Sequence, residues 1–336
     1  MVRQTFKEIR TALFPVQVIV LALTVTGTNL RLSGQAKPGE SVIKRATEQF
    51  ESTPLSTVSL GNQIFMFSGD GGNVVAVVDD GSTLLIDSGV ESRTDELDDA
   101  IFKATARPVT RLVNTHWHFD HTGGNVFFGA AGVTIIAQEN VKKRLSSQQN
   151  APLIGLHDGP YPTQALPTLN YADSMKLQQG SQNLDLTNYG PAHTDGDTVV
   201  YFAPANIVVV GDIFSNAFYP IIDIWSGGSI DGLIHAVEQI LAHTDAETKI
   251  VPGHGPPASR ADLENYHDML VRVRQRVQAL IVAGKTMSET VKEAPTKEFD
   301  LKWGSGYVPP DVFTEMVFTS LRNAHEARSG YGASVH

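Results

Sequence analysis

The hydrophobic pattern predicts short buried strands through the first two thirds of the chain and helices in the last third. Apolar runs bounded by Gly, Asp and Asn turns indicate strands at 64–67, 74–78, 83–87, 133–137, 198–202, 207–210 and 249–252. Apolar residues at helical spacing indicate helices over 93–105, 230–243, 259–284, 287–294 and 310–324. Residues 151–181 are weakly periodic and are expected as a functional loop or a connecting hairpin. Together these elements predict an α/β fold with a helical end.

The first part of the chain has a different pattern. Three basic residues within the first ten positions precede an apolar run from Ala12 to Val25, and small residues follow near Gly34 to Ala36. This order is typical of a secretory signal peptide, so we expect residues 1–36 to be one and the protein to be periplasmic or secreted. The run is short for a membrane span. An uncleaved anchor, a plain N-terminal helix and a cytoplasmic protein stay open as alternatives.

The remaining chain divides by pattern into three parts. Residues 37–57 are polar, contain one possible short helix around 42–50, and are expected as a linker. Residues 58–285 hold the strands and form the main domain. Residues 286–336 are expected as a C-terminal helical extension packed on that domain.

Composition narrows the classes of function. The 336 residues, 41% hydrophobic and 18% charged, are ordinary for a globular protein with a large core. The net charge of −10 and the lack of a basic stripe argue against a nucleic-acid partner. Because the chain has no cysteine, disulfides, thiol nucleophiles and thiolate ligands are excluded. His, Asp and Glu are therefore the strong metal ligands that remain.

The densest group of such residues lies in the stretch 111–125, RLVNTHWHFDHTGGN, directly after a short apolar run. His116 and His118 are two residues apart, so an extended backbone points both imidazoles the same way and lets them bind one ion. If the backbone then turns into a helix, Asp120 and His121 reach a neighbouring position and can bind a second ion.

Further candidates follow other strand-like runs. Gly123 and Gly124 are expected to let the turn pass close to the metals without a Cβ clash. Asp87 is expected either to orient a ligand or to cap the next helix. The downstream candidates are glycine-flanked, as site residues at strand ends of layered α/β folds often are. The predicted groups are His116, His118 and His193 for one ion, and Asp120, His121 and His254 for the other, with Asp212 between them.

These residues resemble the metallo-β-lactamase superfamily. The superfamily's HxHxDH signature matches HWHFDH at 116–121, and its downstream His, Asp and His match His193, Asp212 and His254 in order. The resemblance covers roughly residues 63–280. It implies a four-layer αββα sandwich, with two sheets inside, helices outside and the metals at one edge, here followed by the helical C-terminal extension.

The ligand types themselves indicate metal-activated water. Three neutral imidazoles leave Zn²⁺ with a high effective charge, so the pKa of a bound water falls to roughly 7 from about 15.7. We expect two Zn²⁺ per chain, with iron or manganese open, and a metal-bridging hydroxide as nucleophile. Asp212 is expected to bridge both ions. Asp120 is expected to be catalytic, binding one metal and orienting the hydroxide's proton.

Departures from relatives select among branches of the superfamily. The absence of cysteine excludes the subclass with a cysteine at the second zinc, and His118 stands where the flavodiiron branch has Glu. An acidic residue at Asp212 points away from a dedicated β-lactamase, toward the glyoxalase II, lactonase, phosphodiesterase and tRNA-processing branches. The expected activity is hydrolysis of an ester, lactone, thioester or cyclic amide (β-lactam-like) bond. The alternatives are a phosphodiesterase, a mononuclear iron enzyme resembling persulfide dioxygenases, and a non-catalytic metal-binding module.

Substrate contacts are only weakly indicated. Trp117 and Phe119 alternate with the motif histidines and are expected to wall the site or lie in the core beneath it. Tyr219 and Trp225 lie in the loop that begins at Asp212, and Asn73 lies in a glycine turn. The expected partner is a small-molecule substrate, with no nucleic acid and no stable membrane span. The oligomeric state is left open.

Overall fold

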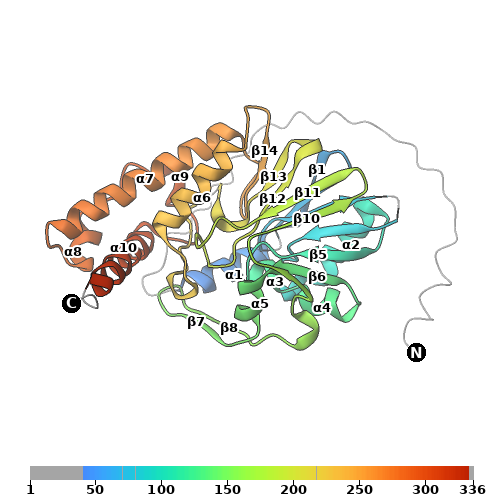
Figure 1. Ribbon diagram of the computed structural model, residues 1–336, viewed down its shortest axis with the longest axis horizontal. Helices are drawn as coiled ribbons and strands as arrows, with labels where there is room; N and C mark the ends of the chain where they lie inside the picture. Colours follow the sequence, from blue (N-terminus) through green and yellow to red (C-terminus); the bar gives the residue numbers. More distant parts are fainter. Residues whose placement is uncertain (1–40, 70, 80, 217, 333–336) are drawn as a thin grey trace. The chain divides into compact units, whose positions relative to one another are not determined.

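Two β-sheets lie face to face, and helices cover their outer faces (Figure 1). The computed structural model describes residues 41–69, 71–79, 81–216 and 218–332, so the expected signal peptide lies outside the described residues. The larger sheet has seven strands in the order β1-β2-β3-β4-β5-β6-β9, and the smaller has five in the order β10-β11-β12-β13-β14. This arrangement confirms the predicted αββα sandwich with its helical C-terminal region.

The bounds of the elements are as follows. The larger sheet contains β1 (Ser56–Gly61), β2 (Ile64–Ser68), β3 (Val74–Val78), β4 (Thr83–Ile86), β5 (Val109–Val113), β6 (Thr134–Gln138) and β9 (Leu169–Tyr171). The smaller sheet contains β10 (Ser174–Gln179), β11 (Gln182–Thr187), β12 (Val199–Phe202), β13 (Ile207–Val209) and β14 (Lys249–Val251). A separate hairpin joins β7 (Gln149–Ala151) to β8 (Leu156–Asp158). The helices are α1 (Val42–Ser52), α2 (Thr94–Thr105), α3 (Phe119–Thr122), α4 (Asn125–Ala130), α5 (Glu139–Leu145), α6 (Ile230–Ala242), α7 (Arg260–Val282), α8 (Met287–Lys292), α9 (Asp300–Trp303) and α10 (Pro310–Gly332).

Alternation along the strands explains the layers. On β3, Val75 and Val77 point into the core between the sheets, while Val74 and Ala76 point to the other face of the sheet, where α2 packs. Because side chains alternate with a period of two, a strand that is apolar on both faces must be covered on both. The continuous apolar runs in the sequence therefore predict central strands, and the structure buries them on both sides.

The smaller sheet is covered by the C-terminal helices. Val200 and Phe202 of β12 face the larger sheet, whereas Val199 belongs to the outer core that α6, α7 and α10 complete. The helix expected over 259–284 is present as α7 and begins with a capping box: the Ser259 side chain accepts from the backbone N–H of Asp262, whose carboxylate accepts from the backbone of Ser259. None of the helices within the described ranges is long and apolar enough to cross a membrane.

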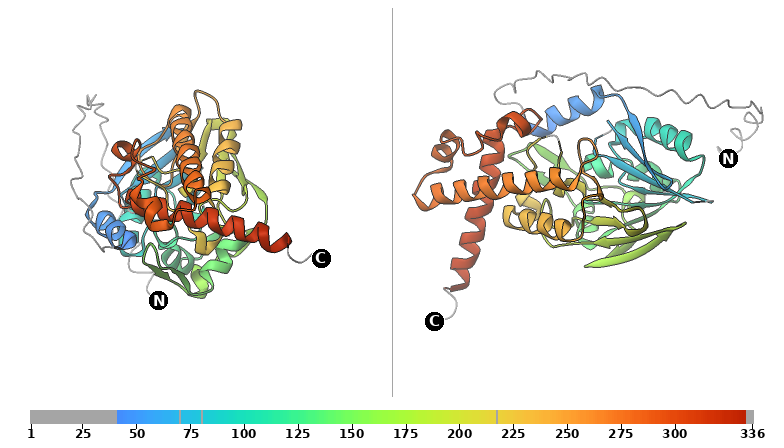
Figure 2. Two further views of the ribbon diagram at one scale, coloured as in Figure 1. Left: turned by 90° about the vertical axis from the view of Figure 1, so that its left-hand side faces the viewer. Right: turned by 90° about the horizontal axis from the view of Figure 1, so that it is seen from above.

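Helix α1 is the short helix expected around 42–50, in the segment 37–57 that was expected as a linker. Its residues Val42, Ala46 and Phe50 are spaced four apart and buried in the core that the C-terminal helices share. Arg45 donates hydrogen bonds of 3.2 and 2.9 Å to the backbone carbonyl of Tyr307, in the C-terminal extension. Figure 2 shows α1, in blue, beside the start of α10, in dark red. The described part of this segment therefore packs against the domain as part of its core.

Candidate metal centre

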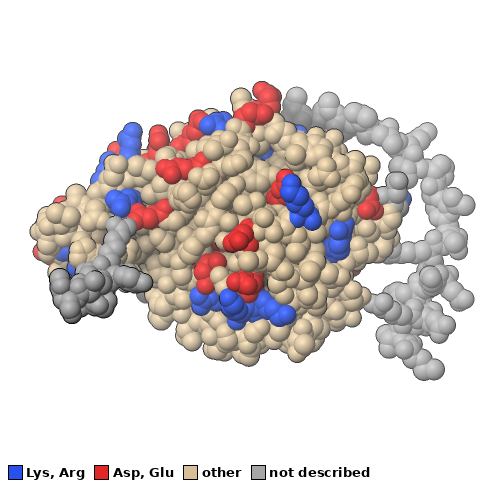
Figure 3. Space-filling view, in the orientation of Figure 1, with Lys and Arg blue, Asp and Glu red and all other residues tan. Residues whose placement is uncertain are grey.

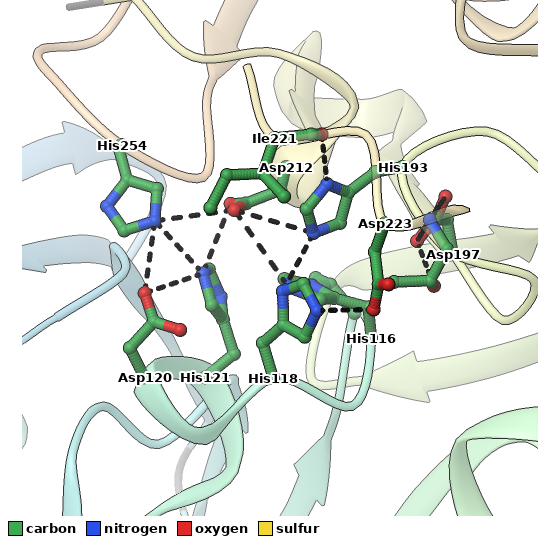
Figure 4. A network of polar contacts seen from close by, with 12 residues as sticks. His116, His118, Asp120, His121, His193, Asp197, Asp212, Ile221, Asp223 and His254 are labelled. Atoms are coloured by element: carbon green, nitrogen blue, oxygen red, sulfur yellow. Dashed lines mark hydrogen bonds and ion pairs between the residues drawn. The ribbon is translucent and has the colours of Figure 1, made fainter. Parts of the chain in front are cut away.

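The predicted ligands meet at one edge of the two sheets, each supplied by a connection that follows a strand (Figure 4). His116 and His118 follow β5, and α3 then carries Asp120 and His121. The other three come from the smaller sheet: His193 follows β11, Asp212 follows β13 and His254 follows β14. Strands β4, β5 and β6 are parallel, as are β13 and β14, so the ends that carry these residues gather at common edges.

The seven side chains form the two groups that the sequence predicted. Ligand atoms lie within 4.8 Å of one another in the group His116, His118, His193 and Asp212, and likewise in the group Asp120, His121 and His254. Asp212 lies between the groups: its Oδ1 is 3.1 Å from His121 Nε2, and its Oδ2 is 3.4 Å from His254 Nε2 and 3.7 Å from His193 Nε2. The shared carboxylate therefore connects both groups.

Hydrogen bonds at the outer ring nitrogens orient the histidines of the first group. His118 donates from Nε2 to Asp223 Oδ2 at 3.1 Å, and His193 donates from Nδ1 to the carbonyl of Ile221 at 2.7 Å. His116 Nδ1 lies 3.0 Å from the hydroxyl of Thr115. Each of these bonds uses the proton of one ring nitrogen and leaves the lone pair of the other facing the centre.

Asp87 orients both groups from beneath. Its Oδ2 accepts a hydrogen bond from His121 Nδ1 at 2.8 Å and from the Thr115 hydroxyl at 2.7 Å, and its Oδ1 accepts from the Thr115 N–H at 2.7 Å. Because the Thr115 hydroxyl donates to Asp87, it accepts from His116. Helix α2 begins only after Arg93, so of the two expectations for Asp87 the ligand-orienting carboxylate is correct and the helix cap is wrong.

The donor set fits divalent metal ions. His116 Nε2 and Asp212 Oδ1 are buried without a hydrogen-bond partner among the described residues. His118 Nδ1 and His193 Nε2, whose lone pairs both face the centre, are 3.0 Å apart. Two lone pairs at this distance repel unless a cation lies between them. Imidazole and carboxylate donors of this kind suit zinc, iron or manganese.

Opposite charges polarise the centre. Burial alone would raise the pKa of Asp212, but the positive charges of His254 and His121 hold it well below its usual range. Burial lowers the pKa of His193 to about 4, helped by the charge of His118. For His254 burial would lower the pKa, yet the carboxylates of Asp212 and Asp120 raise it to about 9. The carboxylates of Asp212 and Asp120 therefore favour a positive charge at His254.

Two glycines approach the ligands closely, but they are not the two glycines that the sequence predicted. A Cβ on Gly123 or Gly124 would first meet backbone atoms of the neighbouring loop, Glu91 N at 2.4 Å and Ser88 O at 2.4 Å respectively. Gly72 and Gly253 have the close contact with ligands that was predicted for Gly123 and Gly124. A Cβ on Gly72 would lie 2.1 Å from the His121 ring, and one on Gly253 too close to Asp212 Oδ1. Glycine at these positions leaves room for the ligands.

Two of the predicted substrate contacts lie elsewhere. Tyr219 is fully buried, stacks on Phe313 and donates its hydroxyl hydrogen bond to Asp300 Oδ1 at 3.0 Å, because the loop after Asp212 packs against the C-terminal extension. Asn73 is also buried, and it donates to the carbonyls of Pro252 and Gly255 at 2.8 and 2.9 Å. Both are structural: Tyr219 anchors the extension, and Asn73 holds the loop that carries His254.

The other three predicted contacts differ in exposure. Trp117 is 2% exposed and packs edge-on against His118, which is the core position given as an alternative. Trp225 is 37% exposed and follows Asp223 in the loop after Asp212. Phe119 is partly buried and lines a cavity of about 460 Å³ together with Asp158 and Tyr161. Phe119 and Trp225 thus remain candidates for substrate contact.

A second cavity adjoins the centre on the side of His254. It has a volume of about 380 Å³ and is lined by Phe50, Met66, Phe218 and Pro256 as well as His254. The Phe50 ring, from α1, stacks parallel to the His254 ring with centroids 5.9 Å apart. This cavity therefore adjoins the metal ligands directly, whereas the first is lined by Phe119, between two ligands in the sequence, and by none of the ligands themselves. Both have the size of small-molecule sites.

Sequence reasoning missed Asp223 and Tyr307. Asp223 was distinguishable as the one acidic residue in the apolar run YPIIDIW that follows a ligand. Its carboxylate also accepts from the Ser226 hydroxyl at 2.6 Å, so it is itself held in place. Tyr307, 5% exposed, packs edge-on against His254 with ring centroids 5.9 Å apart. It reaches the centre only because the C-terminal extension folds back, and no local pattern in the sequence indicates that.

Comparisons with known proteins agree with this geometry. The family model of the metallo-beta-lactamase superfamily matches residues 68–285. A hydroxyacylglutathione hydrolase of Nitrosococcus oceani is 30% identical over 174 residues, which are 50% of this chain and 58% of that protein, so the match spans little more than half of the relative. A metallo-beta-lactamase from Pontibacter korlensis has a TM-score of 0.54 at 20% identity, covering 65% of this chain and 99% of that one. The DIM-1 metallo-beta-lactamase has a TM-score of 0.51 at 19% identity, covering 65% and 98%. At these identities the solved structures show the fold.

Proposed function

The chain belongs to the metallo-β-lactamase superfamily, and we propose that it is a dinuclear zinc hydrolase that opens an ester, lactone, thioester or cyclic amide bond. The observation that carries this proposal is the position of Asp212. Its two oxygens face ligands of both groups, at 3.1 Å from His121 and 3.7 Å from His193. A carboxylate between two nitrogen-rich groups suits two ions that share one reaction site.

Each part of the centre has a role in such a reaction. Zn²⁺ bound there lowers the pKa of a water molecule toward about 7 and polarises a carbonyl oxygen. Asp120 places its Oδ2 3.2 Å from His254 Nε2, which leaves its second oxygen to accept a hydrogen bond from the attacking water. Asp87 and Asp223 keep the imidazoles in the ligating tautomer and orientation.

Several features support a small organic substrate. The cavity of about 380 Å³ that His254 lines, and the cavity of about 460 Å³ that Phe119 lines, have the size of small-molecule sites. Figure 3 shows basic side chains beside acidic ones on the face that it draws. The ion pairs of the chain include Arg144 with Asp195, whose side chains are 2.6 Å apart. A relative named hydroxyacylglutathione hydrolase supports thioesters as the first class to assay. We also propose export to the periplasm or the medium.

Metal analysis and a substrate panel test the proposal. Purified protein should contain about two zinc per chain and hydrolyse at least one member of a panel of thioesters, lactones, aryl esters and β-lactams. Asp120→Asn should lower kcat by at least about 100-fold with the fold retained, whereas Asp231→Asn, on the surface of α6, should not change it. If Asp120→Asn kept both its activity and its metal, the role assigned to Asp120 would be wrong.

The panel also separates the alternatives. Hydrolysis of bis-p-nitrophenyl phosphate without hydrolysis of acyl substrates would replace the proposal by a phosphodiesterase. One iron per chain with oxygen consumption would replace it by sulfur oxidation. Metal binding without turnover of any substrate would leave a metal-binding module. Export is tested by fractionating cells that express the full chain, where unprocessed cytoplasmic protein would refute it.

A further inference from the structure

Tyr307 brings a phenol from the C-terminal extension to the metal centre. It lies between α9 and α10 and is 5% exposed. Its ring packs against Phe218 with centroids 4.1 Å apart, and against His254 and Phe50 at 5.9 Å each. Three aromatic rings from three separate elements thus surround one metal-ligating imidazole.

The phenol of Tyr307 lies beside the ring of His254, and its hydroxyl pairs with none of the ligands. The negative charges of Asp212 and Asp120 both act on it and, with burial as the larger cause, raise the pKa of Tyr307 well above its usual value. Across the described ranges of the chain, no residue forms a hydrogen bond with this hydroxyl. This hydroxyl is not among the fully enclosed unpaired atoms of the described chain, so a bound ligand can reach it and accept its hydrogen bond.

Other buried tyrosines show that this is unusual. Tyr219 donates to Asp300, Tyr161 donates to Asp158 at 3.1 Å, and Tyr171 pairs with Thr198 at 2.6 Å. The hydroxyl of Tyr266 also lacks a partner, but this residue is fully buried behind Phe214, where no ligand can reach it. Tyr307 differs from Tyr266 because it lies beside the ligands and next to a cavity lined by Phe50, Phe218 and His254.

The tyrosine is also held rigidly. Arg45 of α1 donates two hydrogen bonds, at 3.2 and 2.9 Å, to the backbone carbonyl of Tyr307 itself. These bonds hold the backbone, and the packing against Phe218 and Phe50 holds the ring. A side chain held in this way loses little further freedom when it binds a ligand, which favours an effective donor. Because the hydroxyl has no hydrogen-bond partner among the described residues, an incoming oxygen does not have to displace one.

We propose that the Tyr307 hydroxyl donates a hydrogen bond to an oxygen of the substrate bound at the metal centre and stabilises the negative charge that develops on it. This inference rests on the proposed hydrolysis and adds a catalytic residue that lies outside the ligand set. A phenol is protonated at neutral pH and donates one hydrogen bond without changing its protonation state. The C-terminal extension would then be part of the active site, with Arg45 as a positioning residue.

The test uses full-length, zinc-loaded protein and the variant Tyr307→Phe, which removes only the hydroxyl. We expect kcat on the best substrate of the panel to fall about 10- to 100-fold with KM changed less than about twofold. A second measurement does not depend on turnover: calorimetry should show inorganic phosphate, a tetrahedral oxyanion, binding about 10-fold more weakly to the variant. Zinc content should stay equal to that of the wild type.

Tyr219→Phe is the matched control. It removes a phenol from the same packing region, but one that donates to Asp300 and Thr296, away from the ligands. It should lower the melting temperature and leave kcat and phosphate affinity unchanged. Arg45→Met should reproduce part of the Tyr307→Phe effect.

The outcomes are distinguishable. Unchanged kcat and unchanged phosphate affinity in Tyr307→Phe would overturn the inference and leave the proposed hydrolysis intact. Equal losses in both tyrosine variants would show that Tyr307 serves packing only, which also overturns it. If the wild type turns over no substrate of the panel, the proposed function fails, while phosphate binding still decides whether the hydroxyl meets an oxyanion at the centre.

Discussion

At the scale of single residues, the centre depends on carboxylates that bind no metal themselves. Asp223 accepts the Nε2 proton of His118 and is itself held by the Ser226 hydroxyl at 2.6 Å. Burial would raise the pKa of Asp223, but the hydrogen bond from His118 lowers it, so it stays ionised beside the imidazole. The ionised carboxylate fixes which nitrogen of His118 faces the centre.

We therefore expect Asp223→Asn to weaken metal binding. An amide can present its NH₂ group to His118 and so loses the preference for one ring orientation, which should lower zinc affinity about 10- to 100-fold. Competition with a chromophoric chelator measures this. Asp231→Asn on the surface of α6, where the carboxylate pairs with Arg274, controls for the change of charge. Equal affinities in the two variants would show that Asp223 does not orient His118.

A second residue-scale prediction concerns Gly253. Alanine there would place its Cβ against Asp212 Oδ1 and 2.7 Å from the carbonyl carbon of Gly211, so the backbone or the carboxylate must move. We expect loss of zinc from both groups and destabilisation of about 2 kcal/mol or more. Gly81→Ala, whose nearest atom would be 3.8 Å away, should be tolerated. Zinc content measured after dialysis decides between these outcomes.

At the scale of elements, the loops that carry the ligands are held in place by hydrogen bonds to other loops. The side-chain amide of Asn73 crosses from the turn before β3 to the loop that carries His254, donating to Pro252 O at 2.8 Å and Gly255 O at 2.9 Å. The backbone N–H of Asn73 donates to Gly253 O at 2.7 Å. The larger sheet thus holds a ligand of the smaller one.

Asn73→Ala should loosen this loop. The variant keeps the backbone bond but leaves two carbonyls without their donor, which costs about 2–3 kcal/mol of the free energy of unfolding. Zinc should dissociate faster from the group that contains His254. Asn150→Ala, in the exposed hairpin of β7 and β8, serves as the control in urea unfolding. Equal midpoints for the two variants would contradict the role of Asn73.

The sequence predicted the elements whose pattern is strong. The apolar runs of β2, β3 and β4 and the capping box of α7 are local signals, and the structure has them where expected. Strands β10 and β11, with sequences SMKLQQ and QNLDLT, were missed because their polar residues outnumber the apolar ones. Helix α1 was expected only as a possible short helix within a linker, because Val42, Ala46 and Phe50 alone mark its buried side.

The residues of the metal centre likewise divide into those that a local sequence pattern predicts and those that it does not. The ligands stand in a dense motif or beside glycines at strand ends, so their grouping is predictable. Asp223 meets His118 across 105 positions, and Tyr307 reaches His254 through the packing of α1 and the extension. Such partners depend on how elements pack, and a single sequence carries no local signal for that. Tyr219 was assigned to the substrate because its loop begins at a ligand, yet the loop turns its phenol away, toward Asp300.

At the scale of the whole molecule, the centre joins the two sheets, so metal binding and folding are linked. Five imidazoles and two carboxylates from both sheets meet in a buried space, and ions that bind only the folded chain stabilise it by mass action. Without metal, the carboxylates of Asp120 and Asp212 lie 3.2 and 3.4 Å from His254 Nε2, and a proton on His254 takes the place of the ion.

This linkage predicts how stability depends on pH. The carboxylates raise the pKa of His254 to about 9 against burial, whereas the unfolded value is about 6.5. A raised histidine pKa contributes its full stability below about pH 6.5 and loses it as the pH rises through about 9. The metal-free protein should therefore lose on the order of 3 kcal/mol of unfolding free energy between these values.

Urea unfolding at pH 6, 7.5 and 9.5 measures the effect, with one sample treated with chelator and one loaded with zinc. The zinc-loaded sample should lose less stability, since the ion replaces the proton, so the gap between the samples should widen as the pH rises. His254→Gln should flatten the metal-free profile, and His243→Gln, at an exposed surface histidine, should leave it unchanged. If the stability of the chelator-treated and the zinc-loaded samples depended on pH in the same way, His254 would carry no proton in the metal-free protein. The two sheets would then meet at this edge without a cation between them.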